Sequence, residues 1–164
     1  MSTDTLATLF QYKQWIDSET LRAITTVEAA AYAENHRLVH RLMNHIYVVD
    51  SIFKANLTGQ SHGYTALNTP ETPTTDELMA AMTACTDWYI QYVRTMRAVD
   101  LTKIITFRFV DGGRGEMSVI DMLNHVLLHG TYHRGAVGWL LSQSGVTPPK
   151  DVLTVFLRDH HHTG

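Results

Sequence analysis

Three histidines recur at four-residue intervals near the C-terminal end of the chain, at His125, His129 and His133. On an α-helix this spacing places the side chains along one side, close enough to share a ligand. Imidazole is the commonest metal-ligating side chain, so the stretch predicts two or three metal ligands on one helix. The rest of the chain must then supply a further ligand and a helical fold to hold it.

The remaining sequence predicts three other long helices. Residues 3–33 lack Gly and Pro and carry a loose apolar stripe, and a second helix is expected over residues 35–57 with Asn35 as its cap. A capping box of the form Thr74-x-x-Glu77 opens a third helix that runs to residue 99. A similar box at residues 118–121 opens the fourth, which carries the three histidines and runs to residue 144.

The spacing of apolar residues changes between the third and fourth predicted helices. Residues 103–110 are β-branched and aromatic, residues 111–115 have turn chemistry, and residues 116–118 supply a return strand, which together predict a β-hairpin. Residues 151–158 predict a short terminal helix. We therefore expect an all-α fold, an antiparallel four-helix bundle with a small β-hairpin before the fourth helix and a short C-terminal helix.

The length and the ends of the chain suggest one domain. Its 164 residues fit a single helical bundle over residues 1–159, followed by a His-rich tail at residues 160–164. That tail could be native or the remnant of an expression tag. An exposed terminal His run binds metals adventitiously, so we leave it out of the site.

Composition excludes several classes of function. The formal net charge of −3 and the lack of a Lys/Arg cluster give no electrostatic case for nucleic-acid binding. No apolar run approaches the ~20 residues of a membrane span, and the N-terminus lacks the features of a secretory signal. The single cysteine, Cys85, fits a reducing compartment and falls within an apolar stripe, which predicts a buried, inert thiol. We expect a cytoplasmic protein.

Helical wheels indicate which histidines point inward. On the fourth helix, His129 and His133 fall near the middle of the apolar arc, and His125 falls at its edge. On the second helix, His45 lies inside the arc that contains Leu38 and Leu42. A further pair, His36 and His40, lies on nearly the opposite face beside two arginines, which indicates a solvated surface. His45, His129 and His133 are therefore the predicted metal ligands.

One inward histidine is more often a hydrogen-bonded core residue than a ligand, but several imidazoles in one buried patch are costly unless something satisfies them. Three neutral ligands without an inward Asp or Glu leave coordination positions open, as in catalytic metal sites. The sequence also lacks the paired Glu-x-x-His motifs of carboxylate-bridged di-iron bundles. Zinc and nickel both suit imidazole, and we expect one of these divalent ions as the cofactor.

Two segments carry a resemblance to a known family. Residues 45–50 (HIYVVD) and residues 129–135 (HGTYHRG) resemble the corresponding motifs of the DinB/YfiT-like proposed metalloenzymes, and the likeness extends over nearly the whole chain. The resemblance implies a four-helix bundle, often a homodimer, that holds a divalent metal through three histidines, here His45, His129 and His133. It also implies thiol S-transferase or isomerase activity with a low-molecular-weight thiol. The family usually has Gln after His-Arg-Gly, whereas this chain has Ala136, which removes a polar group beside the metal-binding helix.

Three functional hypotheses follow. In the first, the protein is an enzyme in which a divalent ion holds a thiol as thiolate for attack on a small electrophile under the loop of residues 60–74, or activates water for hydrolysis. In the second, it is a non-catalytic metal-binding or stress-response protein, and in the third a metal-free interaction bundle. A protein side chain in the fourth coordination position would favour the second hypothesis over the first.

Three other residues of the fourth helix carry expectations. His125 and Tyr132, at the edges of the arc, either line the pocket or merely pack. Arg134 lies opposite the metal-facing arc, and we expect it to form a structural ion pair or to lie in an interface.

Overall fold

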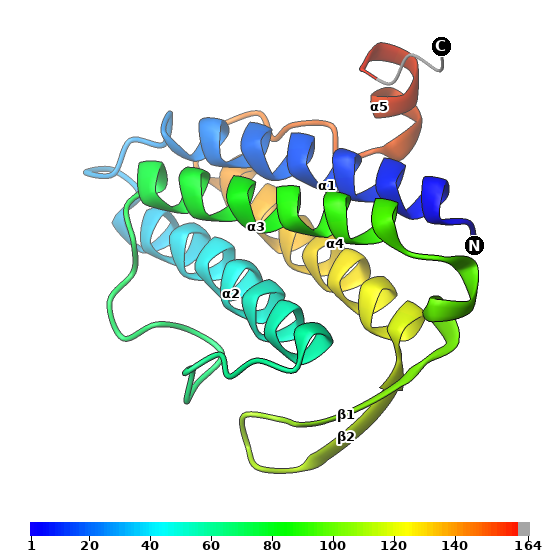
Figure 1. Cartoon of the computed structure of the whole chain (residues 1–164). Helices are drawn as coiled ribbons and strands as arrows, with labels where there is room; N and C mark the ends of the chain where they lie inside the picture. The colour runs from blue at the N-terminus through cyan, green and yellow to red at the C-terminus, as the bar shows by residue number, and fades with distance from the viewer. Residues whose placement is uncertain (161–164) are drawn as a thin grey trace.

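Four long helices packed as a bundle make up most of the computed structural model, which describes residues 1–160 (Figure 1). The helices are α1 (Thr3–Ile24), α2 (Ala33–Thr58), α3 (Thr75–Thr95) and α4 (Val119–Gln143). A short 3₁₀-helix, η1 (Ala98–Thr102), and a hairpin of β1 (Ile104–Arg108) and β2 (Arg114–Ser118) precede α4, and α5 (Leu153–Asp159) follows it. The expected fold class is confirmed. No helix within residues 1–160 is long and apolar enough to cross a membrane.

The starts of α3 and α4 are capped by side chains. In the predicted capping box of α3, Thr74 Oγ1 accepts a hydrogen bond from the Glu77 amide, and Glu77 Oε2 accepts one from the Thr74 amide at 2.8 Å. At the start of α4, Ser118 Oγ accepts a hydrogen bond from the Asp121 amide at 3.2 Å. Both starts satisfy amides that the helix leaves free, as the sequence predicts.

Several predicted helix boundaries are wrong. Helix α1 ends at Ile24 rather than at residue 33, because the hydroxyls of Thr25 and Thr26 donate to carbonyls of its last turn at 2.7 Å each. Helix α2 begins at Ala33, and Asn35 does not cap it but donates a hydrogen bond to Ser144 Oγ at the end of α4. Helix α3 ends at Thr95, four residues early, because Met96 is extended and η1 follows.

The hairpin is attached to the bundle by an aromatic contact. In its antiparallel register Phe107 faces Gly115, so β2 begins within the stretch predicted as a turn. A Cβ at Gly115 would lie 2.5 Å from the Phe107 ring, so any larger residue there would have to displace that ring. The Phe107 ring in turn packs on Phe53 of α2 with a centroid distance of 5.9 Å. This contact fixes the hairpin against the C-terminal half of α2.

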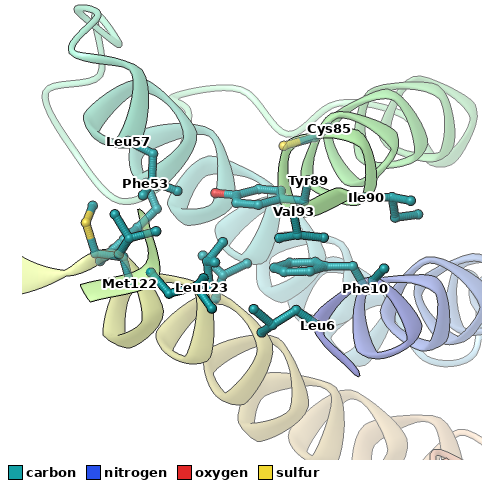
Figure 2. Close-up of a cluster of buried hydrophobic side chains, with 14 of the residues drawn as sticks. Leu6, Phe10, Phe53, Leu57, Cys85, Tyr89, Ile90, Val93, Met122 and Leu123 are labelled. Atoms are coloured by element: carbon teal, nitrogen blue, oxygen red, sulfur yellow. The ribbon is translucent and has the colours of Figure 1, made fainter. Parts of the chain in front are cut away.

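The core between the four helices is mainly apolar and aromatic. Figure 2 shows Phe10 of α1 and Tyr89 of α3 face to face, with ring centroids 4.8 Å apart, surrounded by side chains from all four helices. The Tyr89 hydroxyl donates to the Asp50 carbonyl oxygen at 2.7 Å, which satisfies the polar end of a buried ring. The α1–α3 and α2–α4 pairs are the most closely packed neighbours in the bundle.

A buried ionic network also connects the helices. Lys13 Nζ of α1 lies 2.6 Å from both Asp17 and Asp50 carboxylate oxygens, and Arg134 of α4 donates to Asp17 and Asp151 at 2.9 Å each. The side chains of Lys13, Asp17, Asp50 and Arg134 are at most 3% exposed. Burial alone would lower the pKa of Lys13, but the two carboxylates outweigh it and raise that pKa. The network ties α1, α2 and α4 together and fixes the rotation of α4.

The place of Arg134 in this network predicts a large loss of stability when it is shortened. Arg134→Ala leaves Asp17 and Asp151 without that partner, and we expect the free energy of unfolding to fall by ~3 kcal/mol. Urea denaturation followed by circular dichroism would measure it. Arg37→Ala is the matched control, because it removes an arginine from an exposed pair with Glu34 and should leave the midpoint unchanged. Equal midpoints for the two variants would contradict a structural role for the network.

The burial of Asp50 predicts that the free energy of unfolding depends on pH. Burial raises the pKa of the Asp50 carboxyl from 3.8 to about 6, although Lys13 acts in the opposite direction. Between pH 3.8 and pH 6 the Asp50 carboxyl is therefore protonated more often in the folded chain than in the unfolded chain. Its contribution to stability is therefore largest below about pH 4 and is lost as the pH rises through 6. We expect the difference in thermal midpoint between Asp50→Asn and the wild type to shift in favour of the variant from pH 4 to pH 7. A difference that does not change with pH would be inconsistent with this titration.

Candidate metal centre

Three imidazoles meet between α2 and α4. His45 Nε2 of α2 lies 3.0 Å from His129 Nε2 and 3.2 Å from His133 Nε2, both of α4. The three nitrogens all lie within 4.8 Å of one another. The structure thus brings together the three histidines that the sequence singles out, and this cluster could hold a metal ion.

The separation of the nitrogens fits a metal better than hydrogen bonds. Ligand nitrogens ~2.0–2.1 Å from a tetrahedral ion stand roughly 3.4 Å apart, close to the observed distances. His45 Nδ1 lies 2.7 Å from the Leu67 carbonyl oxygen and donates to it, so in the neutral ring Nε2 carries only its lone pair. That single lone pair cannot accept a hydrogen bond from both His129 and His133, whereas all three Nε2 atoms can face one cation.

The electrostatics of the cluster favour neutral imidazoles. Burial lowers the pKa of His129 to about 3, with His133 and His45 contributing to the shift. Burial and the neighbouring His45 also lower the pKa of His133. Neutral imidazole is the form that binds metals, so at neutral pH these two rings need not lose a proton first.

The cluster lies at the edge of the buried face, not at its middle as the wheel predicted. The buried stripe of α4 passes through Val126, Gly130, Arg134 and Val137, and His129 and His133 are only half-buried beside it. The prediction fails because it assumes that buried means apolar, whereas Arg134 is 3% exposed. The expected ion pair of Arg134 is confirmed.

The inward face of α2 is likewise shifted from the predicted arc. Val39 and Met43 are buried, whereas Leu38 and Leu42 are half-buried. The edge position of His45 leaves the cluster accessible from the side where α2 and α4 meet solvent.

The other histidines and the neighbouring tyrosine have distinct surroundings. The His125 ring stacks on Phe53 at a centroid distance of 4.5 Å, and Tyr132 is 78% exposed with its ring against that of His133. The predicted solvation of His36 and His40 is wrong, because both are half-buried. His40 bonds to Thr75 Oγ1 at 2.8 Å and thereby connects α2 to α3.

Comparison with known protein families identifies the family of this chain. The sequence model of the DinB family matches residues 1–162. The chain belongs to the DinB family. No curated protein matches it. The predicted resemblance is therefore confirmed at the level of the family.

In this DinB protein, the loop between α2 and α3 lies along α2 and is bound to it. Arg41 Nη1 donates to the Thr69 carbonyl oxygen at 2.6 Å, and Asn44 Nδ2 donates to Thr69 Oγ1 at 2.7 Å. The Asn68 side chain donates back to the Arg41 carbonyl oxygen at 3.0 Å. The sequence prediction left these loop contacts out, although Asn44, a buried amide next to His45, is a signal that could have indicated one.

A groove lies between this loop and α2, beside His45. It has a volume of about 520 Å³ and is lined by Arg41, His45 and the loop residues 63–70. The groove is large enough for a small molecule and meets the cluster at His45, whereas His129 and His133 do not line it. Apart from the three histidines, no His, Cys, Asp or Glu within residues 1–160 joins the group.

The remaining candidate ligands of this DinB chain are occupied elsewhere. Asp50 is buried, against the expectation that no carboxylate points inward, but it pairs with Lys13 on the far side of α2. Cys85 is buried as predicted, at the edge of a separate cavity of about 360 Å³. Burial raises the pKa of its thiol to about 11, so it is neither a thiolate ligand nor an activated nucleophile. Of the His-rich tail, only His160 is described, and residues 161–164 lie outside the described residues.

Metal content tests the cluster directly. We expect His129→Ala to lose about one bound divalent ion per chain relative to the wild type after incubation with zinc or nickel and desalting, because two imidazoles bind far more weakly than three. His62→Ala is the matched control, since His62 lies outside the cluster and should leave the content unchanged. Both variants should also carry alanines at positions 160–162, so that the tail contributes nothing. Equal metal content in both variants, measured by mass spectrometry, would rule out the three histidines as a metal site.

Proposed function

We propose that this DinB-family chain is a metal-dependent enzyme of the thiol S-transferase type, which joins a low-molecular-weight thiol to a small electrophile. The observation that carries the proposal is a three-imidazole cluster with no fourth protein ligand among residues 1–160, beside a groove that His45 lines. Open coordination positions are typical of catalytic metal sites, whereas structural sites are closed by protein side chains.

Some residues of the site would hold the ion, and others orient the residues that hold it. His45, His129 and His133 would hold the ion, and the Leu67 carbonyl oxygen fixes the proton of His45 on Nδ1 so that Nε2 faces the cluster. A divalent ion bound there would supply a Lewis acid that stabilises the thiolate over the thiol. Zinc and nickel are the proposed ions, because both suit three imidazoles.

The groove would position the electrophile. In the proposed reaction, the thiol sulfur forms a bond to the electrophilic carbon and the thiol proton passes to solvent. The halide of an aryl halide departs with its electron pair, whereas the ring oxygen of an epoxide keeps the pair, stays attached and takes up a proton. Arg41 is the charged residue that lines the groove, and its contact with Thr69 holds the loop over His45. The arrangement supports a small substrate held between the loop and α2.

Turnover measurements separate this proposal from a non-catalytic metal-binding or stress-response role. We expect the protein loaded with zinc or nickel to consume aryl halide and epoxide electrophiles in the presence of a low-molecular-weight thiol, with the rate reduced at least ~100-fold in His45→Ala. His62→Ala should retain full activity, and the product should contain the thioether. Metal binding without thiol consumption for any electrophile or metal would favour the non-catalytic alternative. Electrophile hydrolysis without thiol would indicate water as the nucleophile.

A further inference from the structure

The cavity at Cys85 lies between α2, α3 and the start of the loop that joins them, and none of the three clustered histidines lines it. Its α2 wall consists of Tyr47, Ser51 and Lys54, which share one side of the helix because they are four and three residues apart. At 100° per residue this side is nearly opposite that of His45. The volume of about 360 Å³ falls within the roughly 300–1,000 Å³ of small-molecule sites.

The α3 wall explains why this space is open. Residues 81, 84, 85 and 88 share one side of α3, and the first three of them are Ala81, Ala84 and Cys85, whose short side chains line the cavity. One turn further along the helix, Trp88 carries a large ring, and Lys54 Nζ lies over it at 5.2 Å from the ring centroid. The cavity therefore has an apolar wall on α3 and a polar wall on α2.

The polar wall carries a positive charge that no side chain of the cavity neutralises. No Asp or Glu of the described chain lines the cavity, and Lys54 Nζ faces the Trp88 ring rather than a carboxylate. The other lysine inside the bundle, Lys13, instead pairs with two carboxylates. Lys54 is half-buried, so an anion in the cavity would form a charge-assisted hydrogen bond that is partly shielded from water.

The acidic protons of the lining are retained at neutral pH. Burial raises the pKa of the Tyr64 hydroxyl, and burial also raises the pKa of the Cys85 thiol to about 11. Hydrogen bonding of Ser51 to each group acts in the opposite direction but is the smaller effect. Tyr64 and Cys85 therefore add no negative charge that would repel an anion, and the Tyr64 hydroxyl can donate a hydrogen bond to it.

We propose that this cavity binds a small aromatic carboxylate, whose charged group pairs with Lys54 and whose ring lies against Ala81 and Ala84. An inorganic anion would leave the apolar wall unused, and a neutral hydrocarbon would leave Lys54 unpaired. The proposal does not rest on the metal centre or on thiol transfer, because the cavity is formed by other residues. Tyr64 lines both this cavity and the groove at His45, so an occupant would contact the loop that holds the His45 ring.

Titration with benzoate, followed by the amide NMR signals of the whole chain, tests the site. Benzoate should cause saturable shifts in the signals of residues 47–64 and 81–88. Benzamide has the same shape without the charge and should bind at least ~10-fold more weakly, because it cannot form the charge-assisted hydrogen bond to Lys54. A chelator is present throughout, so that no metal at the histidine cluster can capture the carboxylate.

Three variants separate the charge of the cavity from its space. Lys54→Met should weaken benzoate binding at least ~10-fold, whereas Lys54→Arg keeps the charge and should retain most of it. Ala81→Leu should weaken binding by filling the cavity without changing the charge. Lys150→Met is the matched control, because Lys150 is exposed and lies outside the cavity. The proposal would be overturned by a wild type without saturable shifts, by equal affinities for benzoate and benzamide, or by wild-type affinity in Lys54→Met or Ala81→Leu.

Discussion

The buried pairing of Arg134 and Lys13 with Asp17 and Asp50 is the interaction on which the arrangement of this protein depends. Removing such charges from water costs several kcal/mol for each ion, and the structure tolerates it because each cation has carboxylate partners. Gly130 makes room for the network, since a Cβ there would lie 2.9 Å from Arg134 Nη1. Because Arg134 must point toward α1, the rotation of α4 is fixed, and His129 and His133 must point toward α2.

Local signals were sufficient to predict most of the fold. The Thr74 and Ser118 caps gave the starts of α3 and α4, and the change of period gave the hairpin, because these features depend on residues close in sequence. The ends of α1 and α3 could not be predicted in the same way. They depend on competition between threonine hydroxyls, η1 and the helix backbone, which no periodic pattern records.

The sequence predicted which residues form the candidate site, but not what surrounds them. The wheels brought His45, His129 and His133 to one interface correctly, because helical spacing alone determines which side chains share a side. They placed the histidines in the middle of the inward face, because a wheel that counts only apolar residues as inward puts the charged but buried Arg134 opposite that face. The packing of the α2–α3 loop against α2 could not be predicted for another reason. It depends on bonds from Arg41 and Asn44 to a segment some 25 residues away, and these form only once the chain has folded.

The contact between His45 and Leu67 has a consequence for how the protein can vary. The acceptor is a main-chain carbonyl, so the orientation of the imidazole does not depend on which side chain stands at position 67. Substitutions along the loop can therefore alter the wall of the groove while the ring keeps its tautomer and direction. The shape of the groove and the orientation of the His45 imidazole are in this way separable in this chain.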